Sequence, residues 1–206
     1  MKRRGWPITS AGTIASVLAL AFVLFTAPVQ AQPAPVAKCT GEDNIAWREQ
    51  ITGCTQAIAS GIYAGKGLAK ILLFRAKAYC MIRDLDLCLA DVEEAIRLDP
   101  TNAFAVGARG DVYLLKQDYA HAVADYTEAA ALEPDNALLF IGRGMAYVGT
   151  GDPDRAIADF EQAIALQPAL AVGLYWRGIA KRLKGDAAAG EADIAAAKKI
   201  DPGVGP

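Results

Sequence analysis

Few side chains in this chain of 206 residues have the types and spacing that catalysis requires. His121 is the only histidine, and no Ser-x-x-Lys, His-Glu-x-x-His or glycine-rich phosphate loop accompanies it. The carboxylates are numerous but evenly dispersed, as expected for helix caps and solvated surfaces. We therefore predict no catalytic residue, no metal site and no cofactor. The protein is predicted not to be an enzyme, with an enzyme's accessory subunit as an alternative.

The charged residues recur instead at a fixed interval of 34 residues. An arginine, two aspartates and a proline each keep this interval. The four columns are Arg75, Arg109, Arg143 and Arg177; Asp91, Asp125, Asp159 and Asp193; Asp84, Asp118, Asp152 and Asp186; and Pro100, Pro134, Pro168 and Pro202. Equal numbers at an equal period favour an Arg–Asp pair in every repeat, or between neighbouring repeats, over a basic track that binds a ligand.

Each interval has the apolar pattern of a helical hairpin. A large apolar residue early in the first helix is followed four places later by a small one, which lets a partner helix approach closely. The small residues are Ala76, Gly110, Gly144 and Gly178, and the large core residues of the second helices are Val92, Tyr126, Phe160 and Ile194. The second helix is expected to begin after the aspartate of the Asp84 column and to end before the proline.

Three runs, Gly144–Tyr147, Gly151–Phe160 and Ala163–Pro168, resemble tetratricopeptide repeats of exported bacterial proteins. The stretch Cys54–Ile58, with Cys39 upstream, is similar to the start of that subgroup's domains. The resemblance implies an all-α fold, a right-handed superhelix of helical hairpins. About four full repeats are expected over residues 69–102, 103–136, 137–170 and 171–204, after an N-terminal half-repeat that caps the stack. The last repeat is expected to cap itself, which leaves dimerisation through that end open.

The N-terminal residues have a different composition. Lys2, Arg3 and Arg4 precede an apolar run from Ile14 to Phe25, and small residues follow at positions that a signal peptidase reads. We predict a signal peptide over residues 1–31, a flexible linker over 32–44 and the repeat domain over 45–206. A periplasmic or secreted protein is expected, with a membrane-anchored protein as the alternative if the signal is retained.

All four cysteines follow the predicted signal, and an even count in an exported chain favours disulfides. Four cysteines permit three pairings, and two free buried thiols remain the alternative for each pair. Cys80 and Cys88 flank the turn of one hairpin, and a Cys39–Cys54 bond would tether the N-terminal stretch to the first helix. We therefore favour Cys39–Cys54 and Cys80–Cys88, with a structural role, because neither forms a Cys-x-x-Cys motif.

The resemblance also implies that a partner binds on the concave face formed by the first helices. The predicted contacts are Leu73, Lys77, Met81, Asp111, Leu114, Ile141, Met145, Tyr175, Ile179 and Arg182. This mainly apolar lining suits an amphipathic helix or an extended peptide of a protein partner, or another copy of the chain.

The net charge of −2 does not indicate binding of nucleic acid. Membrane contact is expected only if the signal is retained. We predict a scaffold or adaptor for a protein or peptide partner. The alternative is a self-associating structural or assembly factor of the cell envelope, such as a homodimer.

Overall fold

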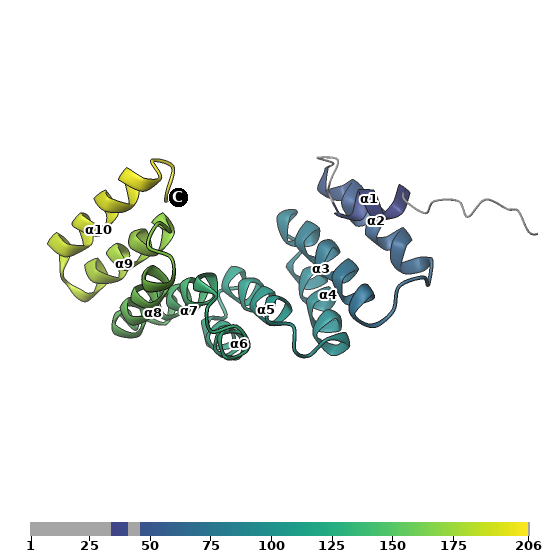
Figure 1. The fold of residues 1–206 in the computed structure, drawn as a ribbon, viewed down its shortest axis with the longest axis horizontal. Helices are drawn as coiled ribbons and strands as arrows, with labels where there is room; N and C mark the ends of the chain where they lie inside the picture. Colours follow the sequence, from purple (N-terminus) through teal and green to yellow (C-terminus); the bar gives the residue numbers. More distant parts are fainter. Residues whose placement is uncertain (1–33, 41–45, 206) are drawn as a thin grey trace, which may run out of the picture. The chain divides into compact units, whose positions relative to one another are not determined.

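Ten α-helices follow one another in the computed structural model, which describes residues 34–40 and 46–205 (Figure 1). The helices are α1 (Ala34–Thr40), α2 (Trp47–Ala59), α3 (Gly65–Met81), α4 (Leu85–Leu98), α5 (Ala103–Leu115), α6 (Tyr119–Leu132), α7 (Ala137–Thr150), α8 (Pro153–Leu166), α9 (Ala171–Lys184) and α10 (Ala187–Ile200). The predicted signal over residues 1–31 lies outside the described residues.

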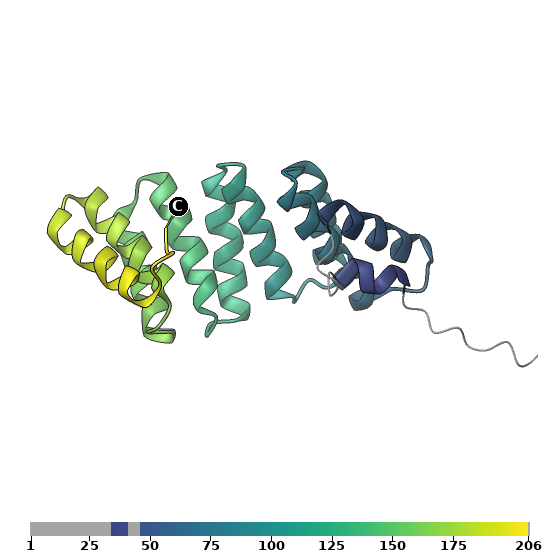
Figure 2. The ribbon, with the colours of Figure 1, turned by 90° about the horizontal axis from the view of Figure 1, so that it is seen from above.

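Each helix packs chiefly on its neighbours in sequence, so α3–α4, α5–α6, α7–α8 and α9–α10 form four consecutive hairpins. The first helices of successive hairpins also touch, α5 against α7 and α7 against α9. Figure 2 shows these hairpins side by side along the chain. The arrangement confirms the predicted all-α fold of stacked helical hairpins.

The capping aspartates begin every second helix of these hairpins. The Asp152 carboxylate accepts a hydrogen bond of 3.1 Å from the backbone N–H of Arg155, and Asp84, Asp118 and Asp186 do the same for their own helices. Such a cap satisfies a backbone donor that has no partner within the helix, and typically stabilises it by about 1 kcal/mol. The predicted starts of the second helices are therefore confirmed.

The turn inside each hairpin needs a residue in the left-handed region. Gly151 and Gly185 adopt φ values of 76° and 102°, while Arg83 and Gln117 occupy the equivalent positions with φ of 67° and 61°. Glycine has no Cβ and tolerates this conformation, whereas other residues adopt it at a cost of about 1 kcal/mol. The fixed repeat frame therefore imposes the same turn even where glycine is missing.

The small residues of the first helices lie under the large residues of the second. A Cβ on Gly144 would come within 2.6 Å of the fully buried Phe160 ring, and one on Gly110 within 3.1 Å of Tyr126. These close approaches confirm the predicted pairing of small and large residues, because only glycine leaves room for the aromatic ring.

Two boundaries differ from the sequence-based expectation. Residues 34–40 of the predicted flexible linker form α1, where the buried Cys39 is joined to Cys54 and its carbonyl oxygen accepts a hydrogen bond of 2.8 Å from Gln50 Nε2. The Cys39–Cys54 bond was expected from the sequence, but the proline–alanine composition gave no sign of the helix itself or of the contact with Gln50. The helix α3 begins at Gly65, one turn before the expected start at residue 69. Residues 41–45 lie outside the described part.

Candidate protein-binding groove

The repeated arginines and aspartates hold each hairpin together. Arg143 Nε and Nη2 donate to the two carboxylate oxygens of Asp159 at 2.8 and 2.7 Å, and the other three pairs have the same bidentate geometry within their own hairpins. The hydrogen bond from Arg143 to Asp159 raises the pKa of Arg143. The predicted pair in every repeat is confirmed, and it lies within the repeat rather than between neighbours.

The last hairpin adds a third charge to its pair. Lys181 Nζ lies 2.8 Å from Asp193 Oδ2, so Asp193 is shared between Lys181 and Arg177. Burial pushes the pKa of Asp193 upward, but the hydrogen bonds from Arg177 and Lys181 outweigh it and leave that pKa below its usual value. Because these arginines are engaged by buried carboxylates, their fork of donors is not available to a ligand.

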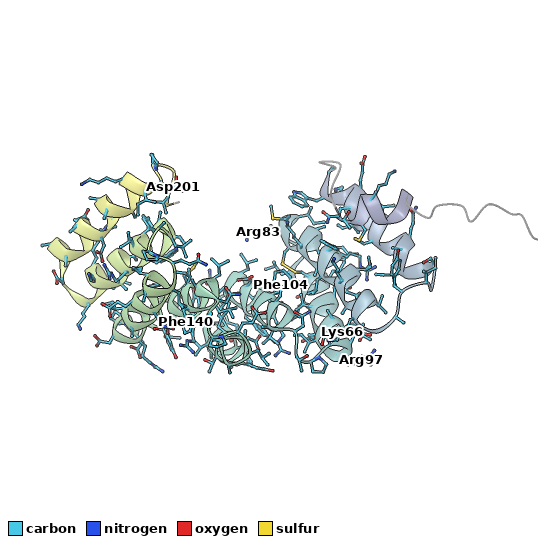
Figure 3. All side chains as sticks on the ribbon, in the orientation of Figure 1. Lys66, Arg83, Arg97, Phe104, Phe140 and Asp201 are labelled. Atoms are coloured by element: carbon cyan, nitrogen blue, oxygen red, sulfur yellow. A yellow bond between two sulfur atoms is a disulfide. The ribbon has the colours of Figure 1, made fainter. Side chains whose placement is uncertain are left out.

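An apolar groove opens between α3 and α5, with α4 beneath it. Its volume is about 370 Å³, and large apolar side chains at its margin are exposed: Phe104 by 68%, Met81 by 54% and Leu115 by 44%. Figure 3 labels Phe104 at the start of α5. The lining comprises Leu73, Ala76, Lys77, Cys80, Met81, Cys88, Val92, Phe104, Ala108, Asp111, Val112 and Leu115. We call this the α3–α5 groove.

Two charged residues at the same repeat position lie on opposite sides of the α3–α5 groove. Lys77 on α3 has its Nζ 5.9 Å from the centre of the Trp47 ring, and Asp111 on α5 accepts a hydrogen bond from the Tyr126 hydroxyl. Desolvation by the surrounding helices raises the pKa of Asp111, while the bond from Tyr126 lowers it in part. The groove is thus an apolar trough with one cation and one anion on its walls.

The predicted binding residues fall into three groups. Leu73, Lys77, Met81 and Asp111 line the α3–α5 groove. Tyr175 and Ile179 line a separate pocket on α9, and the remaining four residues lie in neither pocket. The structure therefore divides the expected continuous surface into two local sites.

Ile141 is a clear correction, because it is only 5% exposed and belongs to the core. It shares a repeat position with Leu73 and Tyr175, but α7 packs closely against the next first helix, α9, whereas α3 does not pack in this way against α5. A Cβ on Gly173 of α9 would lie 3.3 Å from Ile141 Cδ1, so the next first helix covers it. The equivalent Leu73 borders the α3–α5 groove instead.

The other three predicted contacts also point elsewhere. Leu114 and Met145 pack against core clusters, and Arg182 lies 3.4 Å from Glu191 of α10. Periodicity placed these residues on the first helices, but the packing of each helix on its own second helix decided which side they face.

Sequence reasoning missed Phe104, Cys80 and Cys88 as groove residues. Phe104 has a detectable signal, since it places a large aromatic group at a variable repeat position that holds Lys70 in the preceding hairpin. The two cysteines were assigned only to a bond. In the structure Cys80 and Cys88 are joined with a Cα–Cα distance of 5.4 Å, so their disulfide forms part of the groove lining.

Potential metal-binding side chains are not clustered in residues 34–40 and 46–205. No group of three or more His, Cys, Asp or Glu side chains is placed to hold a metal ion there. His121 has a largely exposed side chain, and its Nδ1 lies 2.7 Å from the capping carboxylate of Asp118. Within the same ranges, no helix has the length and apolar character needed to span a bilayer.

Hairpins in series, each clamped by an Arg–Asp pair, define a helical repeat scaffold. A family model described as TPR repeat matches residues 110–151, and one described as tetratricopeptide repeat matches residues 141–204. Residues 110–204 are therefore tetratricopeptide repeats, helical hairpins that stack into a superhelix and serve protein–protein interaction. A comparison with curated protein sequences gives no match.

Solved structures of MamA have a similar fold. A crystal structure of MamA superposes with a TM-score of 0.68 at 20% identity, covering 82% of this chain and 95% of MamA. MamA 41-end from Desulfovibrio magneticus RS-1 gives a TM-score of 0.66 at 16% identity, covering 84% of this chain and all of that one. At such identities the likeness concerns the fold alone.

Proposed function

We propose that this protein is a non-catalytic scaffold that binds an apolar segment of a partner protein in the α3–α5 groove, on the concave face of the repeat domain. The observation that carries the proposal is the cluster of exposed Phe104, Met81 and Leu115 around an apolar trough. Exposed apolar residues that gather in one place mark interaction sites, whereas isolated ones are ordinary.

The shape and chemistry of the groove suggest how a partner is held. The buried floor, which includes Val92 and Val112, accepts one or two aliphatic or aromatic anchors. Lys77 and Asp111 on opposite walls then fix the direction of the segment through its charged or amide groups. An amphipathic helix or an extended peptide meets these requirements.

Export is part of the proposal. Residues 1–31 have the composition of a signal peptide, and the paired cysteines suit an oxidising compartment. Fractionation of producing cells, followed by mass spectrometry of the N-terminus, tests this. A mature N-terminus near residue 32 in the periplasm or medium supports export, while an intact N-terminus in the membrane fraction supports a retained anchor.

Self-association is the second candidate, because the same apolar groove could receive another copy of the chain. Light scattering of the signal-free protein decides between the two. A monomer at micromolar concentration supports a foreign partner, and a dimer that Phe104→Ser dissociates supports self-association through the groove.

The groove itself is tested by affinity capture of a partner and measurement of its dissociation constant. Phe104→Ser removes an exposed ring from the groove margin, and Leu87→Ser removes an exposed leucine from α4 outside the groove. We expect Phe104→Ser to weaken binding at least tenfold, since anchors in interfaces contribute about 2 kcal/mol or more. Equal binding by both variants would remove the groove from the proposal.

A further inference from the structure

The residues after α10 turn back onto the stack. Gly203 N–H donates to Asp201 Oδ1 at 2.9 Å and Val204 N–H donates to the Asp201 carbonyl at 3.1 Å, which reverses the chain direction. Gly205 then approaches Tyr175 of α9, because a Cβ built on Gly205 would lie 3.1 Å from that ring. Figure 1 shows this yellow segment returning from the end of α10, and Figure 3 labels Asp201 where it begins. We call residues Pro202–Gly205 the tail.

The tail and α9 together line an apolar pocket of about 480 Å³. The helix contributes Val172, Tyr175, Trp176 and Ile179, and the tail contributes Val204 and Gly205. All four helix residues are half-buried, as is Val204. The pocket shares no lining residue with the α3–α5 groove. We call it the α9 pocket.

The repeat frame identifies what the α9 pocket corresponds to in the other hairpins. Tyr175 and Ile179 occupy the repeat positions of Leu73 and Lys77, which face the groove between α3 and the next first helix, α5. In α9 the same positions are met by the tail instead of by a helix. The tail therefore covers a surface that elsewhere faces the next repeat.

The tail sequence is suited to this surface. Pro202 cannot extend the helix, and Gly205 has φ of 119°, which a side chain disfavours and which brings the backbone onto the Tyr175 ring. Val204 provides the aliphatic side chain between two glycines. Four residues bury far less area than the roughly 1,200 Å² of a stable protein interface, so this contact is readily displaced.

We propose that the apolar face of α9 that lines this pocket is a second recognition site, for an extended segment of another polypeptide with one small aliphatic side chain flanked by glycines, and that the tail, which itself lines the pocket, covers part of that face. The tail shows the chemistry that the site accepts, a bare backbone against an aromatic ring with one aliphatic group beside it. A partner segment must displace the tail, so it binds only if its affinity for α9 exceeds the contribution of the tail contact.

Trp176 fluorescence reads the α9 pocket directly. Replacing Trp6 and Trp47 with phenylalanine leaves Trp176 as the only tryptophan of the three in the chain. Removal of residues 202–206 from this chain is expected to shift the Trp176 emission to longer wavelength and to increase quenching by acrylamide about twofold, because the ring gains contact with water. Leu183→Ser, an exposed position on α9 outside the pocket, is the control and should change neither.

A synthetic peptide with the sequence of residues 201–206 tests recognition between separate molecules. We expect it to reverse the spectral change of the shortened chain at least tenfold more readily than a peptide with serine in place of the valine, and to leave the full chain unaltered. An unchanged Trp176 emission after removal of the tail would overturn the proposal. Equal binding of the peptide to the full chain and to the shortened chain would also overturn it.

Circular dichroism of the shortened chain separates loss of the tail from loss of the fold. In the full chain, Val204→Ser gives a second reading with little risk to folding, and a partial emission shift is expected. Phe104→Ser should leave all of these signals unchanged. These measurements therefore test the proposal for the α9 pocket separately from the proposal for the α3–α5 groove.

Discussion

The first and last full hairpins bring the same two repeat positions together by different means. Cys80 and Cys88 of the first hairpin are joined by a disulfide across α3 and α4. Three repeats later these positions hold Arg182 and Gly190, and a Cβ on Gly190 would lie 2.5 Å from Arg182 Cγ. One pair is bonded covalently, and the other is held close by the absence of a side chain.

This comparison shows that the repeat frame, and not the cysteines, places the two positions side by side. In the last hairpin the helices come so close that a Cβ on Gly178 would meet the carbonyl oxygen of Gly190 at 2.7 Å. The first hairpin has Ala76 and Cys88 at the matching positions, and its disulfide adds a constraint to a geometry that packing already favours. The two ends of the stack should therefore respond differently to the same kinds of change.

The largest expected effect comes from breaking an ion pair. Arg143→Ala leaves the Asp159 carboxylate, 9% exposed, without its bidentate partner and should lower the free energy of unfolding by about 3 kcal/mol. Arg177→Ala should cost only about 1.5 kcal/mol, because Lys181 still contacts Asp193. Urea denaturation measures both, and equal losses would show that Lys181 contributes nothing.

The disulfide of the first hairpin comes next. The Cys80→Ala/Cys88→Ala double variant should lose about 2.5 kcal/mol, by the entropy of closing a loop with a sequence separation of 8. Thermal melting with and without a dithiol reductant measures this loss. The reductant should destabilise a variant in which Cys80–Cys88 is the only disulfide. In the double variant, which lacks this bond, the reductant can act only through Cys39–Cys54. Identical melting of wild type and double variant would contradict the assignment.

A smaller effect is expected from Gly190→Ala in the last hairpin. The added methyl group must push α9 and α10 apart, which overpacking data place at about 1–3 kcal/mol, and the better helix propensity of alanine offsets about 1 kcal/mol of it. Gly67→Ala in α3 is the matched control, since the nearest atom there is 3.9 Å away. It should leave stability unchanged or raise it. A stable Gly190→Ala protein would show that the two helices separate freely.

The pH dependence of the last hairpin provides the smallest effect. The pKa of Asp193 is lowered in the folded state, so its ionised form stabilises the fold above the unfolded pKa of about 3.9. That contribution is lost as the pH falls from about 4 through the lowered folded pKa. Wild type should therefore be more stable than Asp193→Asn at pH 7, with the difference shrinking below about pH 4 in acid melting experiments. A constant difference across this range would contradict the linkage.

Much of this organisation could be predicted from the sequence because the interval of 34 residues aligns positions with one physical role. Asp152 and its equivalents were predicted to cap helices, and the arginine and aspartate columns to pair, since helical hairpins of equal length repeat their contacts. The structure placed each pair within one hairpin, as for Arg143 and Asp159. The binding residues were less predictable, because exposure depends on neighbours. Ile141 and Leu73 have equivalent positions, yet only Leu73 borders the groove.

The sequence by itself determined the class of fold, the caps, the association of the arginine and aspartate columns and the small-to-large contacts of the core, because each follows from the repeat period. The tertiary structure decided that each Arg–Asp pair lies within its own hairpin. Only the tertiary structure decided that Phe104 and the Cys80–Cys88 bond share a groove, that α1 packs by its disulfide, and that the tail lies on α9. These features depend on contacts between repeats or at their ends, where periodicity no longer fixes which surface is covered.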